Sequence, residues 1–228
     1  MLDPCHLFAG NGVRGHKRAN LLAQGAASGI NHIAFGGAHV HDEHLRRDQI
    51  GSFVPAHPIA GKEVAGVEHA DADLYVGKQV ILTPIERTLT VQLQKAVDVW
   101  TGLGCRVLKM SPEAHDAAFA AVSHLPHLIA FALMNAISGQ APGEDYLSLA
   151  GPGFRDFTRI AASDPKVWRD IMISNREELL AQSKIFQRNL QALELMISSG
   201  NGEALEGLIE QASLTRSNWT MTSNKPPR

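Results

Sequence analysis

The stretch LYVGKQVILTP, residues 74–84, decides the fold of this 228-residue chain. Its centre, VIL at 80–82, is a continuous apolar run, which is typical of a strand buried on both faces of a parallel sheet. Residues 88–103 follow as an amphipathic helix that ends before Gly104, and CRVLKM (105–110) is a further strand. A strand, a helix and a strand of these lengths predict a β-α-β unit with parallel strands.

Upstream, SFVPAHPI (52–59) predicts another short strand. Downstream of Met110 the pattern is helical throughout. Ser111-Pro112-Glu113 and Ser163-Asp164-Pro165 are helix starts, because each places a capping side chain before a proline in the first turn. We expect helices at 112–138, with a kink near Pro126, at 165–199 and at 201–218, with a loop or a single turn between the first two.

The chain therefore divides into an irregular segment at 1–44, an α/β part at 45–111, a helical part at 112–220 and a disordered tail at 221–228. The content is 44% hydrophobic, and 21 Lys and Arg nearly balance 23 Asp and Glu, so no nucleic-acid partner is expected. Cys5 and Cys105 match no metal or redox spacing. The start resembles no signal peptide, and the run LIAFALMNAI is too short to span a bilayer, so we expect a cytoplasmic protein without a membrane segment.

Gly10, Gly12 and Gly15 in AGNGVRG form a literal G-x-G-x-x-G. This motif binds dinucleotides when it follows a buried strand and opens a helix. Here the preceding residues make a poor strand, and no acidic residue closes a second strand about 20 positions later. A cofactor loop and a chance match both remain open.

Histidines form the second group of candidates. His57 follows a buried strand and precedes a glycine turn, where α/β sheets bind ligands, so it is either a base or a structural residue of the turn. His124 and His127 are three apart and share a helix face, whereas His115, nine residues upstream, falls on the opposite face of a straight helix. Without a third ligand at a telling distance, we expect cleft-lining or buried histidines and no metal.

A pair of arginines forms the third group of candidate site residues. Arg155 and Arg159 are four apart in GPGFRDFTRI, and Asp156 could orient either one. If Phe154, Phe157 and Ile160 anchor the segment in a core, the guanidinium groups form a rigid face for a carboxylate or phosphate. The alternative is a surface ladder of ion pairs.

Three segments, FVPAHPIAGKEVAGVEHADADLYVGKQVILTP, HDAAFAAVSHLPHLIAFAL and GFRDFTRIAASDPKVWRDI, resemble the prephenate dehydrogenase family, which includes arogenate and cyclohexadienyl dehydrogenases. The likeness runs from about Leu45 to about Trp219. It implies a partial Rossmann-like α/β nucleotide-binding domain followed by an all-α dimerisation domain, with the active site between them.

The resemblance also implies a function: NAD- or NADP-dependent oxidative decarboxylation of prephenate to 4-hydroxyphenylpyruvate in tyrosine biosynthesis, by a homodimer that tyrosine could inhibit. The alternatives are an arogenate dehydrogenase and a non-catalytic helical dimer. On this likeness His57 is the catalytic hydrogen-bond acceptor, Arg159 the carboxylate anchor and Glu63 a gate or supporting group. Further cleft or supporting positions are His115, His124, His127, Arg155, Asp156 and Trp168.

The sequence departs from the family upstream of Leu45. The family places a D-x-G-S-x-K segment about twenty residues before the catalytic histidine, where this chain reads NHIAFGGAHVHDEHLRRDQ. We therefore expect a truncated or frameshifted nucleotide-binding domain.

Overall fold

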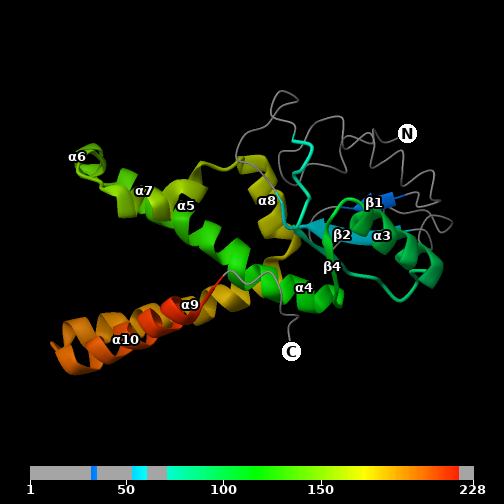
Figure 1. Cartoon of the computed structure of the whole chain (residues 1–228). Coiled ribbons are helices and arrows are strands. Elements are labelled where there is room, and N and C mark those ends of the chain that lie inside the picture. Colours follow the sequence, from blue (N-terminus) through cyan, green and yellow to red (C-terminus); the bar gives the residue numbers. More distant parts are fainter. Residues whose placement is uncertain (1–31, 35–52, 61–70, 221–228) are drawn as a thin grey trace.

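The computed structural model describes residues 32–34, 53–60 and 71–220, and these ranges comprise a small sheet followed by helices (Figure 1). Four strands form the sheet in the order β1-β2-β3-β4, and one helix, α3, lies between the last two strands in sequence. Their bounds are β1 His32–Ala34, β2 Phe53–Pro58, β3 Gln79–Leu82, α3 Thr90–Gly102 and β4 Arg106–Lys109. The expected order of an α/β part and then an all-helical part is confirmed.

The sheet is mixed rather than wholly parallel. β3 pairs with β4 in parallel, with Val80 opposite Val107, as the β-α-β pattern predicts. β2, however, runs antiparallel to β3, with His57 opposite Ile81, and only β1 lies parallel to β2. The β-α-β pattern predicts the direction of β4 relative to β3, but it carries no information about the direction of β2, which comes before the unit in sequence.

The core of the α/β part lies between the sheet and α3. Trp100 and Ala96 of α3 are fully buried against Val80 and Leu82. Tyr75 meets the Trp100 ring edge-on at 5.6 Å between centroids. Truncating a buried tryptophan to alanine costs about 3–5 kcal/mol, so Trp100 contributes strongly to holding β3 and β4 on α3.

The helical part starts at Ser111, whose hydroxyl accepts a hydrogen bond from the backbone N–H of Ala114, as its capping position predicts. A π-helical turn, η4, and a 3-10 turn, η5, interrupt the α-helices. The bounds are α4 Pro112–Phe119, η4 Ala120–His124, α5 Leu125–Ser138, α6 Gly143–Ser148, α7 Pro152–Thr158, η5 Arg159–Ala162, α8 Pro165–Ser174, α9 Arg176–Ser198 and α10 Gly202–Asn218.

Two of these boundaries differ from the expected helices. The irregularity expected near Pro126 is the π-helical turn just before it. The long helix expected at 165–199 is two helices, because the backbone leaves the helical conformation at Asn175 (φ −109°, ψ 36°). Asp164 does begin α8 as expected, accepting hydrogen bonds from the backbone N–H groups of Lys166 and Val167.

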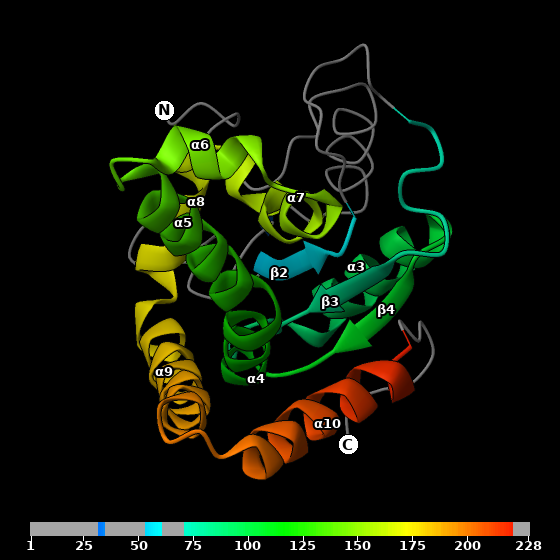
Figure 2. The ribbon, with the colours of Figure 1, turned by 90° about the vertical axis from the view of Figure 1, so that its left-hand side faces the viewer.

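The helices form two arms that diverge from the region of α4 (Figure 1). One arm contains α5, α6 and α7, and the other contains α9 and α10, which meet at the turn between them and then separate (Figure 2). Pro112–Ser138 runs as one 27-residue helical stretch that is long and apolar enough, by length and composition only, to cross a membrane, although only 17% of its most apolar window is buried within the chain. The expectation of no membrane segment therefore stays a prediction.

Candidate active site

His57 lies near the end of β2, where the backbone on both sides is held by the sheet. Phe53 to Ala56 are buried, and the Ile59 N–H continues the antiparallel ladder by donating to the Gln79 carbonyl at 2.8 Å. The His57 ring projects toward α4, and its Nδ1 is 2.8 Å from Nε2 of His115. This contact joins the sheet to the helical part.

His115 is in turn bound to the next residue in the chain. Its Nδ1 is 2.9 Å from Oδ1 of Asp116, and both side chains are almost wholly buried. A carboxylate can only accept, so His115 Nδ1 carries a proton. If both rings are neutral, His115 Nε2 accepts from His57 Nδ1–H, and His57 Nε2 has a lone pair that no described residue engages.

Phe119, one turn after His115, fixes the two rings from the side. Its ring centroid is 4.5 Å from that of His115, in a stacked arrangement, and also 4.5 Å from that of His57. The two imidazoles themselves meet edge-on at 5.1 Å. The pair is therefore held by both hydrogen bonds and aromatic packing.

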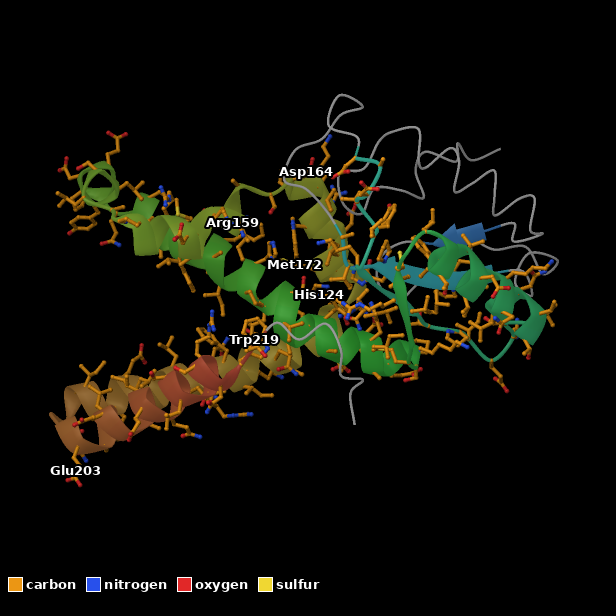
Figure 3. The ribbon with its side chains drawn as sticks, in the orientation of Figure 1. His124, Arg159, Asp164, Met172, Glu203 and Trp219 are labelled. Carbon is orange, nitrogen blue, oxygen red and sulfur yellow. The ribbon has the colours of Figure 1, made fainter. Side chains whose placement is uncertain are left out.

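A third histidine, His124, belongs to the same cluster through Asn175. The Asn175 amide donates to the backbone carbonyl of Asp116 at 2.9 Å and lies 3.2 Å from Nδ1 of His124. Because the Asn175 NH₂ group donates both hydrogen bonds, His124 Nδ1 accepts and His124 Nε2 carries the proton. Figure 3 shows His124 at the junction from which the arms diverge.

His127 lies one turn beyond His124 and packs on α8. Its Nδ1–H donates to the Ser123 carbonyl at 2.8 Å, which leaves Nε2 as an acceptor in the neutral ring. Its ring stacks on Trp168, with centroids 3.4 Å apart and planes inclined by 18°. His124 meets the same indole edge-on at 6.3 Å.

Burial keeps His57, His124 and His127 uncharged. The pKa of His57 is lowered to about 3, first by burial and then by the charges of His115 and His124, whereas Asp116 acts in the opposite direction. Burial, followed by the effect of His115, lowers the pKa of His124 to about 4. Burial also lowers the pKa of His127, although the hydrogen bond to Ser123 partly opposes it.

His115 and His124 would lie on opposite faces of a straight helix, but the helix between them is not regular. Nine residues of straight α-helix turn through two and a half turns, but the chain between them contains the π-helical turn η4, which has more residues per turn. Both rings consequently connect to Asp116, one through its carboxylate and the other through Asn175 and its carbonyl. The described residues contain no group of three side chains arranged to hold a metal ion.

The arginine segment differs from the expected rigid face. Arg155 is 77% exposed and pairs only loosely with its exposed neighbour Asp156, at 3.4 Å. Phe157 is 55% exposed, so it does not anchor the segment within this chain; Thr158 is the buried residue of α7. Arg159 begins η5, which packs against α5, and lies farther along that arm than His124 (Figure 3).

Several predicted residues fall outside the described ranges, namely Glu63, Gly10, Gly12 and Gly15. Conversely, the sequence reasoning missed Asn175 and Phe119. A polar, weakly helix-forming Ser174-Asn175 pair in the middle of a predicted long helix was the available signal for the first. No pattern in the sequence distinguished Phe119 from an ordinary core residue.

Comparison with known proteins places this geometry in a family. Residues 38–109 match the family model described as prephenate dehydrogenase, nucleotide-binding domain, and residues 111–211 match prephenate dehydrogenase, dimerization domain. The cyclohexadienyl dehydrogenase of Zymomonas mobilis is 38% identical over 154 residues, which cover 67% of this chain and 53% of that protein. The chain spans about half the length of the curated relatives it matches.

Solved structures agree. The prephenate dehydrogenase of Aquifex aeolicus, in complex with hydroxyphenyl propionate and NAD+, is 36% identical with a TM-score of 0.74, covering 88% of this chain and 72% of that one. The arogenate dehydrogenase of Synechocystis is 26% identical with a TM-score of 0.69, covering 90% of this chain and 76% of that one. On the strength of both domain matches and this structural likeness, the chain belongs to the prephenate dehydrogenase family.

Proposed function

We propose that this chain catalyses the NAD- or NADP-dependent oxidative decarboxylation of prephenate to 4-hydroxyphenylpyruvate. The observation that carries the proposal is the state of His57: a neutral imidazole whose Nδ1 is occupied by His115 and whose Nε2 accepts no hydrogen bond from the described residues. That nitrogen can accept the proton of the substrate hydroxyl while the oxygen becomes a carbonyl. The relatives that act on prephenate support the assignment.

The described residues fit the reacting end of a nicotinamide cofactor in one respect. A neutral base near the end of β2 adds no positive charge beside an oxidised nicotinamide, which is itself cationic. When bound, the cofactor supplies the acceptor for the hydride that leaves the hydroxyl-bearing carbon. Gly10, Gly12 and Gly15, the weak candidates for its pyrophosphate, lie outside the described residues.

The remaining site residues have roles in binding. His124 presents an Nε2–H donor, and His127 an Nε2 acceptor, so the two suit an oxygen and a hydroxyl group respectively. Since His57, His124 and His127 are neutral, the charge that binds the substrate's carboxylates must come from elsewhere, and we assign it to Arg159, assisted by Arg155. Glu63 and Asp156 complete the set as supporting groups.

We also propose a homodimer in the cytoplasm, with the nucleotide-binding part at 45–111 and the dimerising part at 112–220. Large exposed apolar side chains on the arms support this, because so much exposed apolar area is typical of an interface. They include Leu149, Phe157, Leu180, Leu195, Ile197, Ile209 and Leu214. A partner protomer would also cover the apolar stretch Pro112–Ser138. Inhibition by tyrosine is a further expectation of the family.

The test is prephenate-dependent reduction of NAD by the purified chain, followed by nicotinamide absorbance. NADP and arogenate are tested in parallel, and Arg159→Ala is the binding control. Reduction with prephenate that Arg159→Ala abolishes supports the proposal. Reduction with arogenate alone favours the alternative substrate. No reduction by folded, dimeric protein favours the non-catalytic dimer.

A further inference from the structure

Three side chains from two parts of the fold form a continuous chain of hydrogen bonds that ends at the proposed reaction site. Asp116 Oδ1 is 2.9 Å from His115 Nδ1, and His115 Nε2 is 2.8 Å from His57 Nδ1. His115 is 2% exposed and Asp116 is 3% exposed, whereas His57 is only partly buried. One end of this hydrogen-bonded series is therefore fully buried, and the other end, His57, is only partly buried.

The number of protons shared by His57, His115 and Asp116 follows from the hydrogen bonds that join these three side chains. Asp116 requires a proton on His115 Nδ1, and a single proton occupies the space between the two rings. With both rings neutral, the described residues thus engage three of the four ring nitrogens, and His57 Nε2 is the one whose lone pair they leave unengaged. Any proton that the pair takes up must bind there, whichever ring then holds the charge.

We propose that His57 and His115 act as a two-ring proton relay, in which His115 rather than His57 holds the positive charge during turnover. The substrate O–H bond breaks as the His57 Nε2–H bond forms. The proton on His57 Nδ1 then moves across the 2.8 Å hydrogen bond to His115 Nε2. The resulting imidazolium lies against the Asp116 carboxylate, and His115 is a positioning and proton-storing residue that never touches substrate.

This inference rests on the proposed function, and the protons and electrons of the reaction balance without any exchange with solvent. The hydride, which carries both electrons of the broken C–H bond, would go to the oxidised nicotinamide. The electron pair of the bond to the lost carboxyl group enters the ring as carbon dioxide leaves, and the ring oxygen becomes phenolic. That oxygen then takes back the proton from His57 Nε2, and the shared proton returns to His57 Nδ1. The reaction needs a temporary proton store with no exit, which suits a buried pair.

The relay resolves a chemical difficulty. The pKa of His57 is lowered to about 3, mainly by burial, so a proton held on this ring is unfavourable at neutral pH. Among the described residues, the charged or titratable groups that affect His57 are His115, His124 and Asp116, and of these Asp116 favours a positive charge. Asp116 contacts His115 rather than His57, so the charge is most stable on the inner ring.

The first test is kinetic, on the full chain. His115→Gln keeps an acceptor, Oε1, for His57 Nδ1–H but cannot take up a proton, so kcat should fall roughly 100-fold while both KM values change little. Asp116→Asn keeps the acceptor and removes the charge, and should reduce kcat by roughly 10-fold. Asp98→Asn, on the exposed face of α3, is the matched control and should leave kcat unchanged. A kcat for His115→Gln close to that of the parent chain would overturn the relay.

The second test does not depend on turnover or on the stability of the variants. Nuclear magnetic resonance of the chain with ¹⁵N-labelled histidine reports which nitrogen of each ring is protonated. At neutral pH we expect His57 with a proton on Nδ1 and a bare Nε2, identified by the signal missing in His57→Gln. A His57 protonated on Nε2 would refute the relay. An inactive parent chain with the expected tautomer would instead refute the proposed function alone.

Discussion

Asn175, at the break between α8 and α9, lies 3.2 Å from Nδ1 of His124 and donates at 2.9 Å to the carbonyl of Asp116. One amide group therefore ties the end of α8 to both α4 and η4. The Asn175 side chain is 7% exposed, so water cannot replace these hydrogen bonds readily.

We predict that Asn175→Ala destabilises the protein by about 1–3 kcal/mol, because it leaves a buried carbonyl and a buried ring nitrogen unpaired. Urea unfolding measures the change. The control is Asn189→Ala in α9, whose amide donates to the Ile185 carbonyl from an exposed position, and which should cost well under 1 kcal/mol. Equal effects of the two substitutions would contradict the role assigned to Asn175.

The stability of the protein should fall as the pH falls below about 6.5. The pKa of His124 is about 4 in the folded chain and near 6.5 when unfolded, so between these values the unfolded chain binds a proton that the folded chain does not. The contribution of the neutral ring is thus complete above pH 6.5 and is lost progressively toward pH 4. Its slope is at most about 1.4 kcal/mol per pH unit.

His124→Asn isolates this contribution, since its Oδ1 can still accept from Asn175. Unfolding free energies of the parent and variant, measured at several values between pH 4 and pH 8, should differ in slope only below pH 6.5. Parallel curves over the whole range would show that His124 does not titrate as predicted.

Alanine substitutions of three arginines on neighbouring helices distinguish an effect on substrate binding from a general effect of surface charge. Arg159→Ala should raise KM for prephenate at least 10-fold, because losing a charged hydrogen bond to a carboxylate costs about 1.5–3 kcal/mol. Arg155→Ala should have a smaller effect, since this side chain is 77% exposed and already pairs with Asp156. Arg169→Ala, exposed and paired with Asp170, should leave KM unchanged. Steady-state kinetics tests the order, and a larger effect of Arg155 than of Arg159 would reverse the assignment.

Introducing charge on the exposed surface of the arm formed by α9 and α10 should separate the two protomers. Leu195→Glu in α9 combined with Ile209→Glu in α10 would bury two carboxylates in the proposed interface, which is strongly unfavourable. Light scattering should then give the monomer mass of 24.6 kDa. Val91→Glu, on the exposed face of α3, is the control and should leave a dimer. A double variant that still dimerises would move the interface to the other arm.

The local elements of this fold are predictable from sequence because the interactions that form them lie within a few residues of each other. The β-α-β pattern of β3, α3 and β4 and the caps at Ser111 and Asp164 all occur where the pattern places them. The resemblance to the family added His57 as the proposed acceptor, since its motif extends over many consecutive residues.

Only the tertiary structure decided how those elements combine at the site. The antiparallel pairing of β2 with β3, the π-helical turn and the break at Asn175 are all outcomes of packing between distant segments. The same holds for the hydrogen bond between His57 and His115, which are 58 residues apart in the chain. The sequence by itself determined which residues could carry the chemistry. The fold decided the tautomer and charge of each ring, because both depend on partners and burial that only the assembled chain provides.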